Sequence, residues 1–255
     1  MKRRLSENLK RIEQRIREAC ARAGREPSRV TLVAITKYAS LDIVRTLVDM
    51  GVPHLGESRV QELTKRAAMI HEWLSRRRSR LASGEVESRP RWHMVGHLQR
   101  NKVRAVLPWI EMIHSVDSLR LAEEIDAQSG KLGRVTPVLL QVNAAGEASK
   151  SGVAVAAATH MAEQLATLKH IEVRGLMAMA PLTDEESVLR RTFERVRELY
   201  DEIQGERLCG PAFCELSMGM TNDFEYAIEY GATWVRSGSA LFEGIELAQE
   251  PASAE

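Results

Sequence analysis

The chain has 255 residues, of which 44% are hydrophobic and 28% charged, and this balance is typical of folded globular proteins and not of disordered ones. Its net charge of +1 gives no field that would draw the protein to nucleic acid or to a membrane surface, and no apolar run approaches a membrane span. Three cysteines without metal-ligand spacing, and an N-terminus that lacks an apolar signal core, predict reduced thiols in a cytoplasmic protein.

The first predicted element is an amphipathic helix at residues 5–23. Its apolar side chains recur with helical spacing from Leu5 to Ala23, and Gly24 ends the pattern. Because this helix precedes the first strand, we expect residues 1–24 to be an added helix that covers one end or side of the core.

From residue 30 onward, short apolar strands alternate with helical patterns, as in βαβ units. Strands are predicted at 30–37, 53–56, 92–95, 109–114, 137–143, 172–177, 213–216 and 233–237. Helices are predicted at 42–49, 59–75, 99–106, 118–128, 153–168, 184–203 and 223–230, with a short last helix near Ala240. This rhythm predicts an α/β fold, a single (β/α)8 TIM barrel spanning residues 1–255, in preference to an open sheet.

Residues 76–90 interrupt the rhythm. They are rich in Arg, Ser, Gly and Glu and lack apolar periodicity, so we expect a mobile surface insertion. The arginine-rich run at 76–80 could contact phosphate backbones, but an isolated charge run is more typical of a solvated loop. We therefore expect no nucleic-acid partner.

Lys37 ends the first predicted strand. In (β/α)8 barrels the carboxyl ends of the strands form the face where ligands bind. Where apolar walls keep water from a lysine stem, the neutral amine becomes a nucleophile toward aldehydes. The alternative is a lysine that extends to the rim and merely ends a strand.

The loops after the last two predicted strands carry hydroxyls, glycines and free backbone N–H groups. They read SMGMTND at 217–223 and RSGSALFEG at 236–244. A helix that began at Ser239 would point its free N–H groups into the barrel mouth, which suits a dianionic phosphate. The alternative is that Ser217 and Ser239 only cap helices.

A lysine amine beside a phosphate site is the geometry that pyridoxal 5′-phosphate (PLP) requires, because PLP has an aldehyde at one end and a phosphate at the other. Arg236 ends the last strand between the two, at the position of the pyridine ring. A guanidinium is charged at all ordinary pH values. Facing the ring nitrogen, it would donate a hydrogen bond, discourage protonation there and weaken the ring as an electron sink.

Ordered motifs over nearly the whole chain carry a resemblance to a known family. They read LVAITK (32–37), LGESRVQE (55–62), WHMVGHLQRNK (92–102), IHSVDS (113–118), QVN (141–143), SKSG (149–152), RGLMAM (174–179), LSMGM (216–220) and VRSGSALF (235–242). With these motifs the chain resembles the YggS/PROSC family of PLP-binding, PLP-homeostasis proteins, which is related to the N-terminal barrel of bacterial alanine racemase.

The resemblance implies a set of cofactor-binding residues and no metal. PLP would form a Schiff base with Lys37, Arg236 would face the pyridine nitrogen, and the phosphate would lie against Ser217, Gly219, Gly238 and Ser239. Ser58 stands where the family has an asparagine near the cofactor, so that contact would be lost or bridged by water. Lys150 matches a lysine in a family loop associated with cofactor handling, and the alternative for it is a solvated loop lysine.

The resemblance to alanine racemase raises the question of catalysis. That enzyme takes its second base, a tyrosine, from a separate C-terminal domain in a dimer, whereas this sequence ends just after the barrel, and among its tyrosines only Tyr38 is expected near the mouth. We therefore assign no catalytic residue. We expect a monomeric protein of intracellular PLP (vitamin B6) homeostasis, which holds PLP with little or no turnover and has PLP-dependent apo-enzymes as candidate partners. Two alternatives stay open: a low-activity PLP-dependent amino-acid racemase, and a phosphate-ligand barrel enzyme in which Lys37 is a general base.

Overall fold

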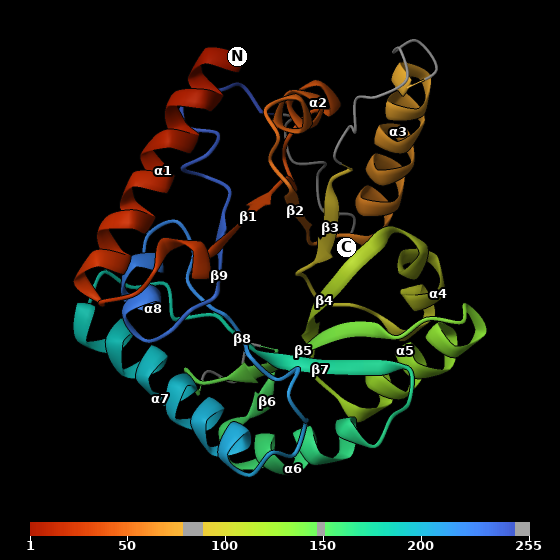
Figure 1. The fold of residues 1–255 in the computed structure, drawn as a ribbon, viewed down its shortest axis with the longest axis vertical. Helices are drawn as coiled ribbons and strands as arrows, with labels where there is room; N and C mark the ends of the chain where they lie inside the picture. Colours follow the sequence, from red (N-terminus) through yellow and green to blue (C-terminus); the bar gives the residue numbers. More distant parts are fainter. Residues whose placement is uncertain (79–88, 147–150, 248–255) are drawn as a thin grey trace.

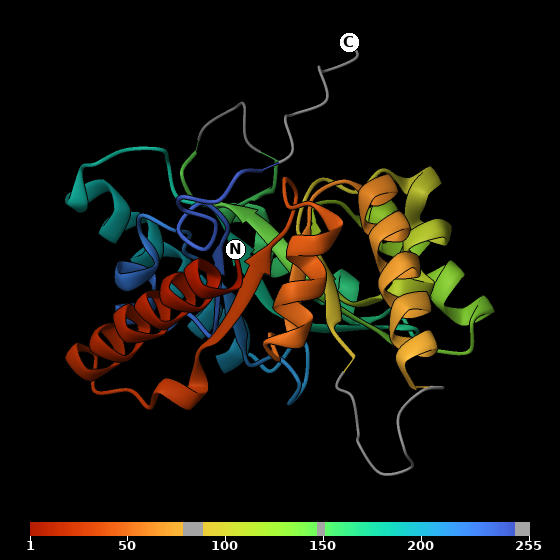
Figure 2. The same cartoon turned by 90° about the horizontal axis from the view of Figure 1, so that it is seen from above.

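The computed structural model describes residues 1–78, 89–146 and 151–247. Within them, parallel strands close into a barrel that a ring of helices surrounds (Figure 1). Figure 2 shows the barrel from the side, with the β1 arrow running toward its upper end. The predicted (β/α)8 barrel is therefore confirmed.

The barrel wall consists of eight parallel strands in the described part of the chain. They are β1 (Thr31–Ile35), β2 (His54–Glu57), β3 (Arg91–Met94), β4 (Ile110–Val116), β5 (Thr136–Asn143), β7 (Ile171–Ala178), β8 (Glu215–Ser217) and β9 (Trp234–Ser237). β1 pairs with both β2 and β9, and the pairing of β4 with β5 completes the circle. The short β6 (Val153–Ala154) pairs with the end of β5, where the sequence predicts the start of a helix.

The surrounding helices follow the predicted order. They are α1 (Lys2–Arg22), α2 (Leu41–Asp49), α3 (Val60–Arg78), α4 (Val103–Val106), α5 (Leu119–Lys131), α6 (Val155–Ala166), α7 (Glu186–Gly205) and α8 (Phe224–Glu229). The predicted helix at 99–106 is divided into a 3-10 turn (Arg100–Lys102) and the single turn of α4. None of the helices in the described ranges is long and apolar enough to cross a membrane.

α1 is the predicted additional helix, and it lies beside α8 on the outside of the barrel (Figure 1). Its buried stripe includes Leu5, Ile12 and Ile16. The same face carries Asn8, whose side-chain amide donates to the carbonyl oxygens of Leu241 (3.0 Å) and Glu243 (2.9 Å). α1 therefore holds the segment that follows β9.

The helix predicted near Ala240 is wrong: residues 240–244 form turns. The carbonyl oxygens of Leu241 and Glu243 accept from the Asn8 side chain, which holds this segment in its turn conformation. Gly244 then adopts φ +70°, in the left-handed region, where a helix cannot continue.

The predicted insertion at 76–90 begins too early, because Arg76 and Arg77 belong to the last turn of α3. There they pair with Glu72 and Asp49, respectively. Residues 79–88, Lys150 and the tail from 248 lie outside the described residues.

The core has two parts. A large apolar layer lies between the strands and the helices. A small cluster lies inside the barrel and consists of Val33, Met112, Leu139, Met177 and Trp234. Several buried polar side chains share the barrel interior with this cluster, namely His54, His93, His114, Ser217 and Arg236. These polar groups lead to the functional site.

Candidate functional site

The residues predicted for the site lie at the carboxyl ends of neighbouring strands. Lys37 follows β1, Ser58 follows β2, and Ser217 ends β8. Arg236 lies in β9, and Gly238 and Ser239 come directly after it. Since β9 pairs with both β1 and β8, three of these strand ends meet on one side of the barrel mouth.

Lys37 is exposed in a turn beyond β1, and its Nζ lies 4.7 Å from the centre of the Tyr38 ring. Of the two environments considered for Lys37, the structure shows a lysine that extends to the rim, without apolar walls around its stem. Its backbone is held from outside the barrel: the Arg66 guanidinium on α3 donates to the carbonyl oxygens of Thr36 and Lys37, the latter at 3.3 Å. The side chain is thus free at the mouth, while the backbone that carries it is fixed.

Glu57 and Arg66 form a buried pair that the sequence analysis missed. The fully buried carboxylate accepts from Arg66 at 2.8 Å and from the Ser58 backbone N–H at 2.8 Å. Burial raises the pKa of Glu57, and Arg66 opposes this shift. Because Arg66 also binds the backbone at Lys37, this pair ties the ends of β1 and β2 together. The one feature of the sequence that could have indicated the pair is Glu57, a charged residue at the end of a buried strand.

Ser58 packs tightly against the loop after β3. A Cβ built on Gly96 would lie 2.3 Å from the carbonyl oxygen of Ser58. Glycine at position 96 is therefore needed for this close approach, which keeps half-buried Ser58 at the rim of the mouth.

Arg236 is buried, with 4% of its surface exposed, and its guanidinium is held by neutral groups. It donates to Ser217 Oγ (2.6 Å), to the Ser217 carbonyl (2.8 Å) and to the Ala178 carbonyl (2.9 Å). Burial lowers the pKa of Arg236 to about 10, with Asp223 opposing the shift, so the group stays charged at neutral pH. Among the described carboxylates, none makes an ion pair with it, so this buried cation is suited to an anionic or electron-rich ligand.

Three hydroxyl groups cluster where β8 and β9 end. Ser239 Oγ donates to Thr221 Oγ1 at 3.0 Å, and Thr221 Oγ1 lies 3.1 Å from Ser237 Oγ. Ser239 is a predicted phosphate ligand, whereas Thr221 and Ser237 are not, although both lie in the two predicted phosphate-binding segments, 217–223 and 236–244. The predicted helix start is absent, so hydroxyls supply the donors at this corner.

Gly219 gives the loop after β8 its shape. Its φ of +90° lies in the left-handed region, and a Cβ there would lie 2.7 Å from Phe224 Cα at the start of α8. Its carbonyl accepts the Arg236 backbone N–H at 3.1 Å, which joins this loop to β9.

Ser217 has a second set of partners inside the barrel. Its hydroxyl lies 2.8 Å from His114 Nδ1 and accepts from Arg236. His114 in turn contacts His93 (2.9 Å), and His93 contacts His54 (2.9 Å). The sequence motifs contain these histidines, but their role depends on strand register, which the motifs do not state.

The mouth thus combines an exposed lysine amine, a buried guanidinium that makes no direct ion pair among the described residues, and a group of hydroxyls. These groups suit a ligand with an electrophilic carbon and a phosphate. Within the described ranges no cluster of His, Cys, Asp or Glu is arranged to hold a metal ion.

Comparison with known proteins identifies relatives of the whole barrel. The family model for the alanine racemase N-terminal domain matches residues 8–245. The pyridoxal phosphate homeostasis protein of Aquifex aeolicus is 36% identical over 236 residues, which cover 92% of this chain and 96% of the relative.

Solved structures give the same result. A crystal structure of an unknown protein from Bifidobacterium adolescentis is 40% identical with a TM-score of 0.84, covering 94% of this chain and 95% of that one. PipY of Synechococcus elongatus, solved with PLP bound, is 33% identical with a TM-score of 0.74, covering 91% of this chain and 99% of PipY. The chain belongs to the alanine racemase N-terminal domain family and, within it, to the pyridoxal phosphate homeostasis proteins.

Proposed function

We propose that this protein binds PLP in the barrel mouth as a Schiff base on Lys37 and acts in intracellular PLP homeostasis with little or no catalytic turnover. The observation that carries the proposal is the buried guanidinium of Arg236, which makes no direct ion pair among the described residues and lies in β9, the strand that pairs with β1 and precedes Ser239. The relatives named above support it, since they include PLP homeostasis proteins and a PLP complex.

The residues present fit the cofactor. Lys37 supplies an exposed amine for the aldehyde, and Ser239, Gly238 and Gly219 line the corner for the phosphate. Ser217 is also proposed there, although its hydroxyl already contacts Arg236 and His114. Ser58 is proposed at the rim.

The identity of Arg236 favours a holding role. A guanidinium at the pyridine nitrogen donates a hydrogen bond without supplying a proton, which leaves the ring a poor electron sink. Tyr38 is the tyrosine closest in sequence to Lys37, whereas Tyr200 and Tyr226 lie on the outer helices α7 and α8, so no second proton donor is assigned.

Titration with PLP tests the binding site. The wild-type protein should develop the visible absorbance of a protonated Schiff base with one PLP per chain, and Lys37→Ala should abolish that band. Lys131→Ala, at the end of α5, is the matched control and should behave as wild type. A normal band in Lys37→Ala would contradict the assignment.

Turnover is tested separately in deuterated water. L- and D-alanine incubated with the PLP-loaded protein should acquire almost no deuterium at the α-carbon. Deuterium incorporation over many turnovers would overturn the holding role and support the racemase alternative.

A further inference from the structure

A chain of hydrogen-bonding side chains crosses the barrel interior below Arg236. It runs from Ser217 to His114 (2.8 Å), then to His93 (2.9 Å) and to His54 (2.9 Å). The Trp234 ring borders all three imidazoles, with ring centres 5.0 to 5.8 Å away, and its own N–H donates to Glu215. Trp234 therefore shields the chain without interrupting it.

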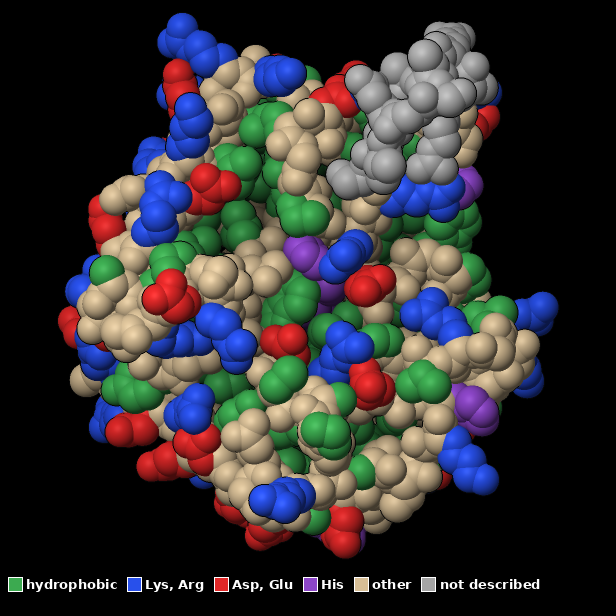
Figure 3. All heavy atoms as spheres, in the orientation of Figure 1, with side chains coloured by type: hydrophobic (Ala, Val, Ile, Leu, Met, Phe, Trp, Pro, Cys, Tyr) green, Lys and Arg blue, Asp and Glu red, His purple; other side chains and the backbone are tan. Residues whose placement is uncertain are grey.

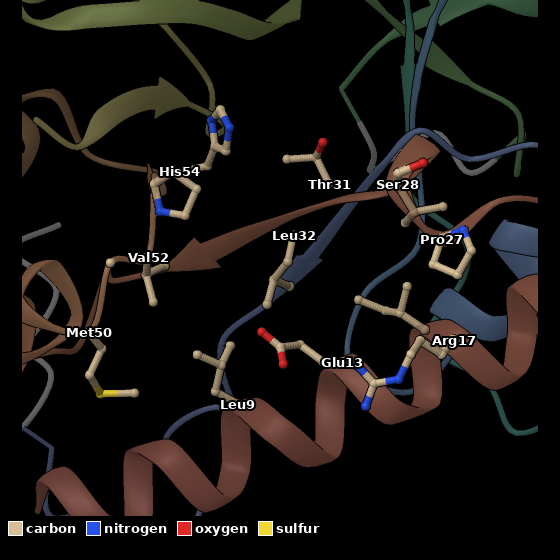
Figure 4. Close-up of a pocket in the computed structure, with 14 residues that line it drawn as sticks. Leu9, Glu13, Arg17, Pro27, Ser28, Thr31, Leu32, Met50, Val52 and His54 are labelled. Carbon is tan, nitrogen blue, oxygen red and sulfur yellow. The ribbon is translucent and has the colours of Figure 1, made fainter. Parts of the chain in front are cut away.

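The far end of the chain meets a cavity of about 560 Å³ at the end of the barrel where the strands begin. His54 lines this cavity together with residues of β1 and α1. Figure 4 shows Leu9 and Glu13 of α1 pointing toward Leu32 of β1, with Val52 and His54 along another side. In the surface view of Figure 3, histidine atoms are visible near the centre of the molecule. The histidine chain thus connects the mouth to a second opening.

All three imidazoles are neutral at neutral pH. Burial lowers the pKa of His93 to about 3, and it lowers the pKa of His114 well below its ordinary value, with His93 and Arg236 adding to the effect. The pKa of His54 is also lowered by burial and by Arg91, while Glu111 opposes the shift. A neutral imidazole has one N–H and one bare nitrogen, so each ring must donate on one side and accept on the other.

Two directions are possible for such a chain. Arg236 can only donate, so it occupies one lone pair of Ser217 Oγ in both cases. When the Ser217 hydroxyl donates to His114 Nδ1, each ring carries its proton on Nε2. When an anion in the mouth accepts the Ser217 hydroxyl instead, His114 must donate from Nδ1, and each ring carries its proton on Nδ1.

We propose that His54, His93 and His114 form a reversible proton path that links the phosphate end of the barrel mouth to the cavity at the opposite end. For one reversal, Ser217 Oγ gains a proton from water in the mouth and passes its own proton to His114 Nδ1. His114 and His93 each pass their Nε2 proton to the next ring, and His54 releases its Nε2 proton to water in the cavity. Each group gains one proton and loses one, so no charge is left inside the barrel. The hydroxide left in the mouth and the hydronium formed in the cavity are neutralised by exchange with bulk water.

The direction of the path would report whether the mouth is occupied. Without a ligand, His114 is the acceptor that the structure offers to the Ser217 hydroxyl, so the Nε2–H direction is favoured. A bound phosphate offers a stronger, anionic acceptor and favours the reverse direction. Ligand binding would thus change His54 from a donor to an acceptor toward the cavity.

Nitrogen-15 NMR of histidine-labelled protein tests the resting direction, and it does so without any ligand. His54, His93 and His114 should be neutral Nε2–H tautomers at neutral pH, with couplings across the two N–H···N bonds. A charged ring, or an Nδ1–H tautomer in any of the three, would overturn the inference.

The ligand-dependent step rests on the proposed function and is tested with three probes: PLP, pyridoxal and inorganic phosphate. PLP should exchange the positions of the protonated and bare nitrogen resonances in all three rings, whereas pyridoxal, which lacks the phosphate, should not. Unchanged tautomers with PLP bound, or reversal with pyridoxal, would overturn the path. If PLP forms no Schiff base, the proposed function fails, and inorganic phosphate at saturating concentration then tests the proton path. A change of the three rings from Nε2–H to Nδ1–H would support the path, and unchanged tautomers would overturn it.

Variants assign the signals and isolate the hydroxyl. Single His→Gln substitutions at positions 54, 93 and 114 identify the resonances, and His160→Gln, on the exposed face of α6, is the matched control. Ser217→Ala should prevent the reversal while the rings remain neutral. Reversal in Ser217→Ala would show that the hydroxyl does not set the direction and would overturn the inference.

Discussion

At the scale of single residues, the site is defined by what surrounds each polar atom. Arg236 is buried and donates to two carbonyls and one hydroxyl, without a direct ion pair among the described residues, whereas Ser239 is exposed and its hydroxyl donates to that of Thr221. A cofactor whose pyridine nitrogen faced Arg236 would place its phosphate at Ser239, where the hydroxyl groups can donate to it.

Ser239→Asp should weaken PLP binding by about fivefold or more. A carboxylate beside the phosphate costs about 1 to 4 kcal/mol, depending on how far water screens the two charges. Ser239→Asn has nearly the same shape without the charge and is the control. Dissociation constants from absorbance titration measure the effect, and equal affinity of Ser239→Asp and Ser239→Asn would show that the phosphate corner is misplaced.

Gly219→Ala should destabilise the fold by about 2 kcal/mol or more, because its φ is positive and a Cβ there would lie 2.7 Å from Phe224 Cα. Gly205→Ala is the matched control: Gly205 ends α7, and nothing lies within 4 Å of its Cβ position. Urea unfolding should show a lower free energy of unfolding for Gly219→Ala, and an unchanged or slightly higher one for Gly205→Ala. An unchanged free energy of unfolding in Gly219→Ala would mean that this loop can shift to accommodate a Cβ atom.

At the scale of elements, two distant contacts hold the mouth together. Asn8 of α1 binds the segment after β9, and Arg66 of α3 binds the backbone at Lys37. Neither contact follows from local sequence pattern. Helix spacing predicts α1 and α3 correctly, but which polar side chain reaches which carbonyl depends on how each helix packs on the barrel.

Arg66→Gln should cost about 3 kcal/mol of stability, because it leaves the fully buried Glu57 carboxylate without its cation. Adding Glu57→Gln should recover part of this loss. Arg76→Gln, on the same helix, removes an exposed pair with Glu72 and should cost at most about 1 kcal/mol. Equal losses for Arg66→Gln and Arg76→Gln in chemical denaturation would contradict the buried-pair account.

At the scale of the whole molecule, the barrel could be predicted because its strands are short apolar runs that alternate with amphipathic helices. The positions of Lys37 and Arg236 at strand ends could be predicted for the same reason. The absence of the last predicted helix could not be predicted, because the segment after β9 is held by Asn8, more than 200 residues earlier in the chain. The histidine chain could not be predicted either, because it forms only when the registers of β2, β3 and β4 all turn their histidines into the barrel.

The histidine chain makes global stability depend on pH. The pKa of His93 is about 3 in the folded protein, against an ordinary value near 6.5, so the unfolded chain binds this proton more readily. Stability is therefore fully present above about pH 6.5 and falls as pH decreases, by about 1.4 kcal/mol per pH unit for this group.

Urea unfolding at neutral pH and at about pH 5 should show a loss of about 2 kcal/mol from His93 alone. His93→Gln should reduce the difference between the two pH values, and His160→Gln, which is exposed on α6, should leave it unchanged. An equal pH dependence in wild type and His93→Gln would indicate that His93 is charged in the folded protein.

The central claim is that Lys37 holds PLP. Borohydride reduction of the PLP-loaded protein, followed by digestion and mass spectrometry, tests this most directly, because reduction makes the lysine–PLP bond permanent. The account predicts one pyridoxyl-phosphate group per chain, on Lys37. A label on another lysine, or no label at saturating PLP, would contradict it.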